Sequence, residues 1–175
     1  MIPSEVQLIH NLLKDYEELK KFLLENNQIT FEFFQTEIFR KYLLISCASL
    51  FENQIQLIIV ELSEKHSDSE TIVSLIKAKA IERQYHTYFD WKNKSANSFY
   101  KLFGNDFAEK MKTKIKSDEN IKEAEKAFLE LGSERNLLVH ENFLNYPLNK
   151  TVAEISELFT KATRYIEFIR EELLC

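Results

Sequence analysis

Glycine and proline are nearly missing from this chain. Its 175 residues include only 2 Gly and 2 Pro. Tight β-turns and glycine-rich phosphate loops depend on these residue types. Their scarcity argues against hairpin-rich β folds, Rossmann folds and P-loop enzymes, and it favours an all-α protein built from a few long helices.

Cysteine and histidine are also sparse. Cys47 and Cys175 are the 2 cysteines, and they form neither a disulfide framework nor a pair with metal-ligand spacing. His10, His66 and His86 lie far apart in the sequence, and none has a histidine partner three or four residues away. The sequence therefore predicts no metal site, no cofactor and a reducing compartment.

Uninterrupted apolar runs are short. None approaches the roughly 18 residues that are needed to cross a bilayer. The first 21 residues are polar and include the acidic residues Glu5, Asp15 and Glu17, whereas a signal peptide has a basic start and an apolar centre. We expect a cytoplasmic protein that does not associate with a membrane.

The chain is rich in helical periodicity. Apolar residues make up 45% of it and recur at steps of three and four. This spacing predicts helices over residues 4–26, 30–66, 101–116, 118–143 and 151–173, with a short helix and an irregular connection over 67–98. The helix over 30–66 is apolar on more than one side, so we expect it to lie centrally, and a dimer partner could be one of its neighbours. No repeat or flexible linker interrupts residues 1–175, which predicts one domain, a four- to five-helix up-and-down bundle.

The middle of the chain is basic, although the net charge is −5. Between residues 77 and 116, ten Lys or Arg residues stand against four Asp or Glu residues. The lysines at the end of this block are candidates for binding the phosphates of a nucleic acid: Lys110, Lys112, Lys114 and Lys116. Interleaved aromatic side chains could stack on bases: Tyr85, Tyr88, Phe89 and Trp91. Alternatively, the lysines form a solvated helix face and the aromatic side chains complete the core.

Residues 131–143 hold the one cluster that suggests chemistry. On a helix, Asn136 and His140 lie four residues apart on one face, and Arg135 projects to the side. An imidazole that titrates near neutral pH moves protons, and a guanidinium holds phosphate through two hydrogen bonds. The cluster therefore suits phosphoryl chemistry without a metal. A structural alternative pairs Arg135 with Glu130 or Glu134 and places His140 in the core. Gly132, in the same predicted helix, is expected to be a weak point that costs about 1 kcal/mol relative to Ala.

The pattern Arg135-Asn136-x-x-x-His140 resembles the Arg, polar residue, spacer and His motif of HEPN domains. The resemblance covers essentially the whole chain, because the long apolar helix with Ser49 and Glu52, the variable middle and the amphipathic last helix follow the family's order. The chain is most similar to the RiboL-PSP branch, which is associated with RNA-targeting toxins and antiviral systems.

This resemblance implies a homodimer in which two motif-bearing helices approach across a two-fold axis. His140 would act as general base or acid on a ribose 2′-hydroxyl, Arg135 would stabilise the phosphorane, and Asn136 would orient the phosphate or the imidazole. Glu52 is a further candidate catalytic residue, although a solvated surface Glu is the simpler interpretation. The implied function is a metal-independent endoribonuclease, a toxin or antiviral defence effector.

Two other functions fit the same sequence. The first is a catalytically silent HEPN-like module that binds RNA, a nucleotide or a protein partner. The second is a neutralising or scaffolding subunit of a two-protein module, whose acidic ends face a basic partner. The expected partners are an RNA substrate, a second copy of the chain, and a cognate antitoxin or another defence-system protein.

Overall fold

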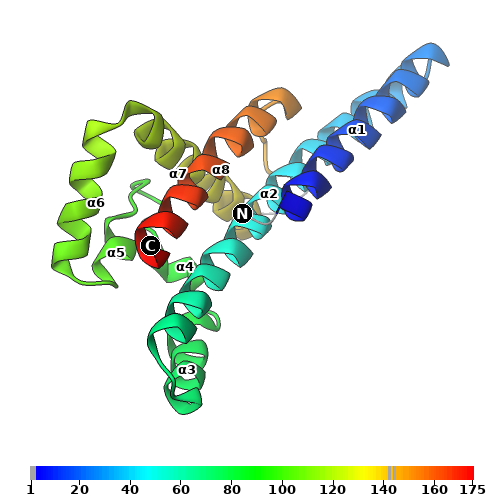
Figure 1. Ribbon diagram of the computed structural model, residues 1–175. Helices are drawn as coiled ribbons and strands as arrows, with labels where there is room; N and C mark the ends of the chain where they lie inside the picture. The colour runs from blue at the N-terminus through cyan, green and yellow to red at the C-terminus, as the bar shows by residue number, and fades with distance from the viewer. Residues whose placement is uncertain (1–2, 142, 144) are drawn as a thin grey trace.

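The computed structural model consists of helices packed around one long helix, α2 (Figure 1). It describes residues 3–141, 143 and 145–175, and for residues 3 and 4 the backbone alone. The prediction of an all-α fold is confirmed, because these residues contain no strand beyond an isolated bridge between Asp90 and Ser95. The elements are α1 (Pro3–Glu25), α2 (Ile29–His66), α3 (Glu70–Ile76), the π-helix η1 (Lys77–Ile81), α4 (Tyr85–Tyr88), α5 (Asn97–Lys101), α6 (Asn105–Ser117), α7 (Glu119–His140) and α8 (Val152–Leu174).

Side-chain caps fix where the last two long helices begin. The Asp118 carboxylate accepts hydrogen bonds from the backbone N–H groups of Asn120 and Ile121 at the start of α7. Thr151 and Glu154 form the predicted capping box at the start of α8. These local signals explain why the predicted starts of both helices agree with the structure.

Helix α2 is the centre of the protein, as its apolar composition predicts. It contacts α1, α3, α7 and α8, and Leu43, Leu44 and Ile55 are fully buried in it. It also corrects the expectation that no segment is apolar enough to cross a bilayer. An 18-residue window of α2 has a mean hydropathy of 1.6, enough by length and composition to cross a membrane. Half of that window is buried inside the protein. The core therefore accounts for part of its apolar composition.

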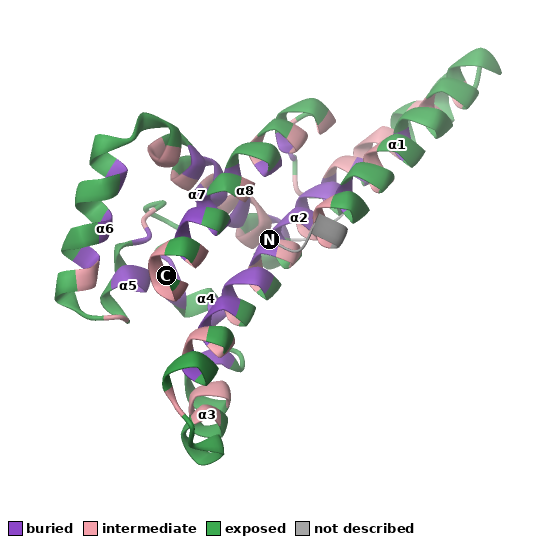
Figure 2. Cartoon of the chain, in the orientation of Figure 1, coloured by how far each residue is buried: buried purple, intermediate pink, exposed green. Residues whose placement is uncertain are grey.

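Helix α1 and residues 29–42 of α2 project from the rest of the protein as a two-helix arm (Figure 1). The arm is held together by the stacked rings of Tyr16 and Phe39, 4.2 Å apart, and by the hydrogen bond between the hydroxyls of Tyr16 and Thr36. Much of its surface is exposed (Figure 2). The large exposed apolar side chains of its α2 part are Ile29, Phe31, Phe33, Phe34, Ile38 and Tyr42. This surface has no covering element within the described part of the chain.

The aromatic residues of the connection between α3 and α6 complete the core. Tyr85, Tyr88 and Phe89 are buried, and Phe89 packs against Phe128 of α7 with ring centroids 4.9 Å apart. These three side chains are therefore not available to stack on bases, and the structural alternative is correct for them. Half-buried Trp91 lies over α7 close to Gly132.

Gly132 is a packing requirement rather than a weak point. A Cβ atom at this position would lie 1.9 Å from the Cζ3 atom of the Trp91 ring. Only a residue without a side chain lets the indole approach the α7 backbone this closely. The expectation that alanine would be the more stable residue here is therefore wrong. Helix propensity takes no account of the Trp91 ring, which reaches α7 from another segment of the chain.

Candidate functional site

Arg135 lies one and a half turns before the end of α7 and points toward α2. Its Nη2 atom is 3.5 Å from the Oε2 atom of Glu52, and its Nη1 atom donates to the Asn136 Oδ1 atom at 3.1 Å. The Arg135 side chain is 27% exposed and that of Glu52 is 30% exposed. A guanidinium has five N–H donors. The contacts with Asn136 and Glu52 leave N–H groups of Arg135 that can bind a ligand. The structure thus brings three of the four predicted catalytic residues together.

The acidic residues next to Arg135 in the sequence have other partners. Glu130 forms an ion pair with Lys150. Glu134 accepts a hydrogen bond of 3.1 Å from the Tyr146 hydroxyl, and burial together with this contact raises the pKa of Tyr146 to about 12. The structural alternative of an Arg135 pair with Glu130 or Glu134 is therefore wrong. Arg135 instead forms its ion pair with Glu52 of α2.

Tyr85, a buried tyrosine of α4, is affected by the charges of both Arg135 and Glu52. Burial raises the pKa of the Tyr85 hydroxyl, the charge of Glu52 raises it further, and the charge of Arg135 acts in the opposite direction. Tyr85 therefore lies within electrostatic reach of both side chains. Its ring also packs against Trp91, with centroids 5.7 Å apart. The aromatic segment that packs against α7 at Gly132 thus also brings a tyrosine within the electrostatic influence of Arg135, which the sequence did not predict.

His140 is the last residue of α7 and is exposed. The structural alternative that places it in the core is therefore wrong. Leu137 and Val139, its neighbours on α7, are 45% and 52% exposed. The imidazole thus lies on an open surface that also exposes apolar side chains.

The guanidinium and the imidazole leave α7 in different directions. Five residues of an α-helix separate Arg135 from His140, which corresponds to a rotation of roughly 140° around the helix axis. Arg135 faces Glu52, whereas His140 is the last residue of α7.

Lys41 is a charged residue near the site that sequence analysis missed. It is 9% exposed, its Nζ atom donates to the Phe143 carbonyl oxygen at 2.7 Å, and the same atom lies 5.4 Å from the Phe143 ring centroid. Lys41 thus anchors the segment that follows His140 to α2. A signal was present, because Lys41 precedes Glu52 by eleven residues, three turns along the same face of a helix.

The four predicted phosphate-binding lysines divide between two faces of α6. Lys110 and Lys114 both form ion pairs with Glu172 of α8, the former at 2.9 Å. Burial alone would raise the pKa of the Glu172 carboxyl, but the hydrogen bonds from Lys114 and Lys110 outweigh this and lower it. Lys112 and Lys116 lie on the other face and line a cavity of about 330 Å³ together with lysines of neighbouring elements: Lys94, Lys122 and Lys126.

Neither metal ligands nor a reactive thiol accompany these residues. In residues 3–141, 143 and 145–175, no group of three or more His, Cys, Asp or Glu side chains could hold a metal ion. Cys47 is buried, and burial raises the pKa of its thiol. The groups available for chemistry at this surface are therefore the guanidinium, the amide, the imidazole and the carboxylate.

Comparison with known proteins identifies the family. The family model described as RiboL-PSP-HEPN matches residues 10–174, which is nearly the whole chain. No curated protein and no solved structure gives a significant match. Arg135, Asn136, His140 and Glu52 all lie within the matched residues.

Proposed function

Because the chain belongs to the RiboL-PSP-HEPN family, we propose that it is a metal-independent endoribonuclease. Its biological role would be that of a toxin or antiviral defence effector in the cytoplasm, with a cognate antitoxin or another defence-system protein as partner. The observation that carries the proposal is the half-buried Arg135 guanidinium, held by Glu52 and Asn136 near the end of the helix that presents His140.

The chemistry needs only the side chains of the motif. A neutral His140 takes the proton of a ribose 2′-hydroxyl, and the resulting oxygen attacks the adjacent 3′-phosphorus. The bond from phosphorus to the 5′-oxygen of the next nucleotide breaks, and a protonated His140 of the second chain gives that oxygen a proton. Arg135 stabilises the charge of the phosphorane, and Asn136 orients the guanidinium. The products are a 2′,3′-cyclic phosphate and a 5′-hydroxyl.

Two observations support the homodimer on which this mechanism depends. Arg135 and His140 project from α7 in directions roughly 140° apart, which fits a site that a second copy of the chain completes. Apolar side chains are exposed on both sides of His140, and the arm presents a further apolar surface. Exposed apolar surfaces of this kind mark interfaces.

The first test of the proposal is the identity of the products. Purified protein incubated with single-stranded RNA in EDTA is expected to yield fragments with 2′,3′-cyclic phosphate and 5′-hydroxyl ends. The attack by the 2′-oxygen gives these ends, and no step of the proposed mechanism uses a metal ion that EDTA would remove. End-group analysis and mass spectrometry measure both ends. Fragments with 5′-phosphate ends, or activity that EDTA removes and Mg²⁺ restores, would contradict the mechanism. RNA that is bound but left intact would favour a silent binding module.

Binding of the substrate is expected to involve one face of α6 and not the other. In the double variant Lys112→Ala/Lys116→Ala, the salt dependence of binding to 2′-O-methyl RNA should flatten by roughly 0.7 per lost phosphate contact in a plot of log K against log salt concentration. Titrations followed by fluorescence anisotropy at several salt concentrations measure this slope.

Lys110 and Lys114 provide the matched control on the same helix. Glu172 holds both of them on the side of α6 that faces α8 and offsets one of their two charges, whereas the partner of Lys112 is the exposed Glu109. The variant Lys110→Ala/Lys114→Ala should therefore change the slope less than Lys112→Ala/Lys116→Ala does. Equal slopes in all three proteins would mean that neither face of α6 contacts the RNA backbone, and that the lysines form a solvated helix face.

A further inference from the structure

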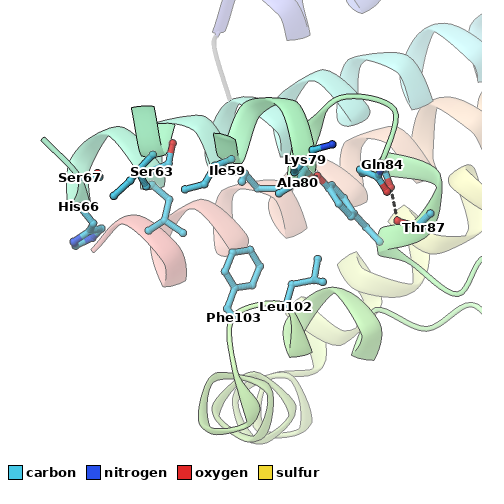
Figure 3. A pocket seen from close by; sticks show the side chains of 14 residues that line it. Ile59, Ser63, His66, Ser67, Lys79, Ala80, Gln84, Thr87, Leu102 and Phe103 are labelled. Carbon is cyan, nitrogen blue, oxygen red and sulfur yellow. Dashed lines mark hydrogen bonds between the residues drawn. The ribbon is translucent and has the colours of Figure 1, made fainter. Parts of the chain in front are cut away.

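A cavity of about 680 Å³ lies between the second half of α2, the α3–η1 segment, α4 and the two residues that follow α5. Ile59 and Ala80 lie on one side of it, and Leu102 and Phe103 project from the other (Figure 3). Small-molecule sites in proteins have volumes of roughly 300–1,000 Å³ and are mostly apolar. No residue of the Arg135 motif lines this cavity, so it is separate from the ribonuclease site and independent of that proposal.

The π-helix η1 shapes one wall of the cavity. The N–H of Glu82 donates to the Lys77 carbonyl oxygen at 2.9 Å, the five-residue step of a π-turn. The wall is further fixed by the hydrogen bond from the Tyr88 hydroxyl to the Ala80 carbonyl oxygen. Arg83, directly after η1, has the left-handed φ of 59°. Such irregular backbone costs energy and is concentrated at functional sites.

The charge of the lining favours an anion. No Asp or Glu is among the 14 lining residues, although the protein as a whole carries a net charge of −5. Lys77 is paired with Glu64 at 2.8 Å, whereas Lys79 has no ion-pair partner among the described residues. Lys79 and Gln84 lie toward the same end of the cavity (Figure 3). An ammonium and an amide thus offer N–H donors at one end of an apolar chamber.

The dimensions of the cavity favour a single-chain ligand over a docked helix. A helix about 10 Å in diameter has a cross-section of roughly 80 Å², so 680 Å³ would hold fewer than two turns of it. An alkyl chain is much thinner and fits lengthwise. Leu102 and Ile72, which line the cavity, are 60% and 50% exposed. An alkyl chain would cover both of these side chains.

We propose that this cavity binds a single-chain amphiphile with an anionic head group. The alkyl chain lies between Ile59 and Phe103, and the head group lies at Lys79 and Gln84. The site has a built-in reporter, because Tyr88 lines the cavity, its ring is 6.0 Å from that of Tyr85, and Tyr85 is 5.7 Å from Trp91. Trp91 is the single tryptophan of the chain.

The experiment uses decanoate below its micellar concentration as the probe. Calorimetry and Trp91 fluorescence are expected to show saturable binding of decanoate, and weaker binding of decyltrimethylammonium, which has a cationic head. Lys79→Ala should weaken decanoate binding roughly two- to fivefold, as befits one exposed ion pair. Lys77→Ala should leave the affinity unchanged, because this lysine does not line the cavity.

A second pair of variants tests the location. Leu102→Asp places a negative charge in the apolar wall and should abolish binding. Leu75→Asp is the matched control, because Leu75 is 59% exposed and lies outside the cavity. Circular dichroism should confirm that both variants remain folded. No saturable binding to wild-type protein, equal binding to both variants, or equal affinity for the two head groups would overturn the proposal.

Discussion

Replacing His140 by alanine is expected to lower the rate of RNA cleavage by about 10²- to 10⁴-fold, the contribution typical of a general acid–base residue. The side chain is exposed at the end of α7, so its removal leaves no cavity and should not change the unfolding temperature. Single-turnover cleavage of a labelled RNA measures the effect.

The matched control is His10→Ala, because His10 is also exposed and lies on α1, far from α7 in the sequence. It should cleave RNA at the wild-type rate. Sedimentation should give twice the 20.8 kDa chain mass for wild type and for both variants. Unchanged cleavage by His140→Ala would reject the site, and a loss of the dimer would assign the effect to assembly instead of proton transfer.

Arg135 offers an independent test of the same site. Arg135→Ala should match the loss caused by His140→Ala, since it removes the group that stabilises the phosphorane. Arg135→Lys keeps the positive charge but cannot form two parallel hydrogen bonds to phosphate, so it should recover only part of the activity. Full activity in Arg135→Lys would show that charge alone is required.

The substitution Gly132→Ala is expected to destabilise the protein by about 1–3 kcal/mol, the usual cost of overpacking. The new methyl group would meet the Trp91 ring at 1.9 Å. This cost opposes the gain of about 1 kcal/mol that helix propensity would give. For a chain of this size, each 1 kcal/mol corresponds to a decrease of roughly 2–4 °C in the midpoint of thermal unfolding.

A double-mutant cycle identifies the cause. In a Trp91→Ala background the ring is gone, so Gly132→Ala should become neutral or stabilising. Urea unfolding of the four proteins gives the coupling free energy between the two positions. The same destabilisation in both backgrounds would show that contact with Trp91 is not the reason for Gly132.

The elements of this fold were predictable because their signals are local. Apolar spacing predicted the long helices, and the caps at Asp118 and Thr151 predicted where α7 and α8 begin, because a capping contact spans three residues or fewer. For residues 67–98 the sequence predicted only a short helix and an irregular connection. Its π-helix and its burial against α7 depend on neighbours that are distant in the sequence.

The sequence predicted which residues make up the candidate site, but not which of them contact one another. The motif residues were found from their spacing, and Glu52 only from the family resemblance. The ion pair between Arg135 and Glu52 joins positions 83 residues apart, and no local pattern distinguishes Glu52 from Glu130 or Glu134 as the partner. Lys41 was missed because its one signal, a position eleven residues before Glu52 on the same helix face, matches no motif.

By itself, the sequence determined that the protein is helical and where its main helices begin, and it predicted which residues carry the chemistry. Tertiary structure decided three further matters: which carboxylate holds Arg135, which lysines pair with Glu172, and what the glycine at position 132 packs against. Helix formation depends on contacts within about four residues, so the spacing of apolar residues along the sequence is enough to predict it. Packing joins side chains from distant segments, and its outcome depends on the shapes that meet in the folded protein.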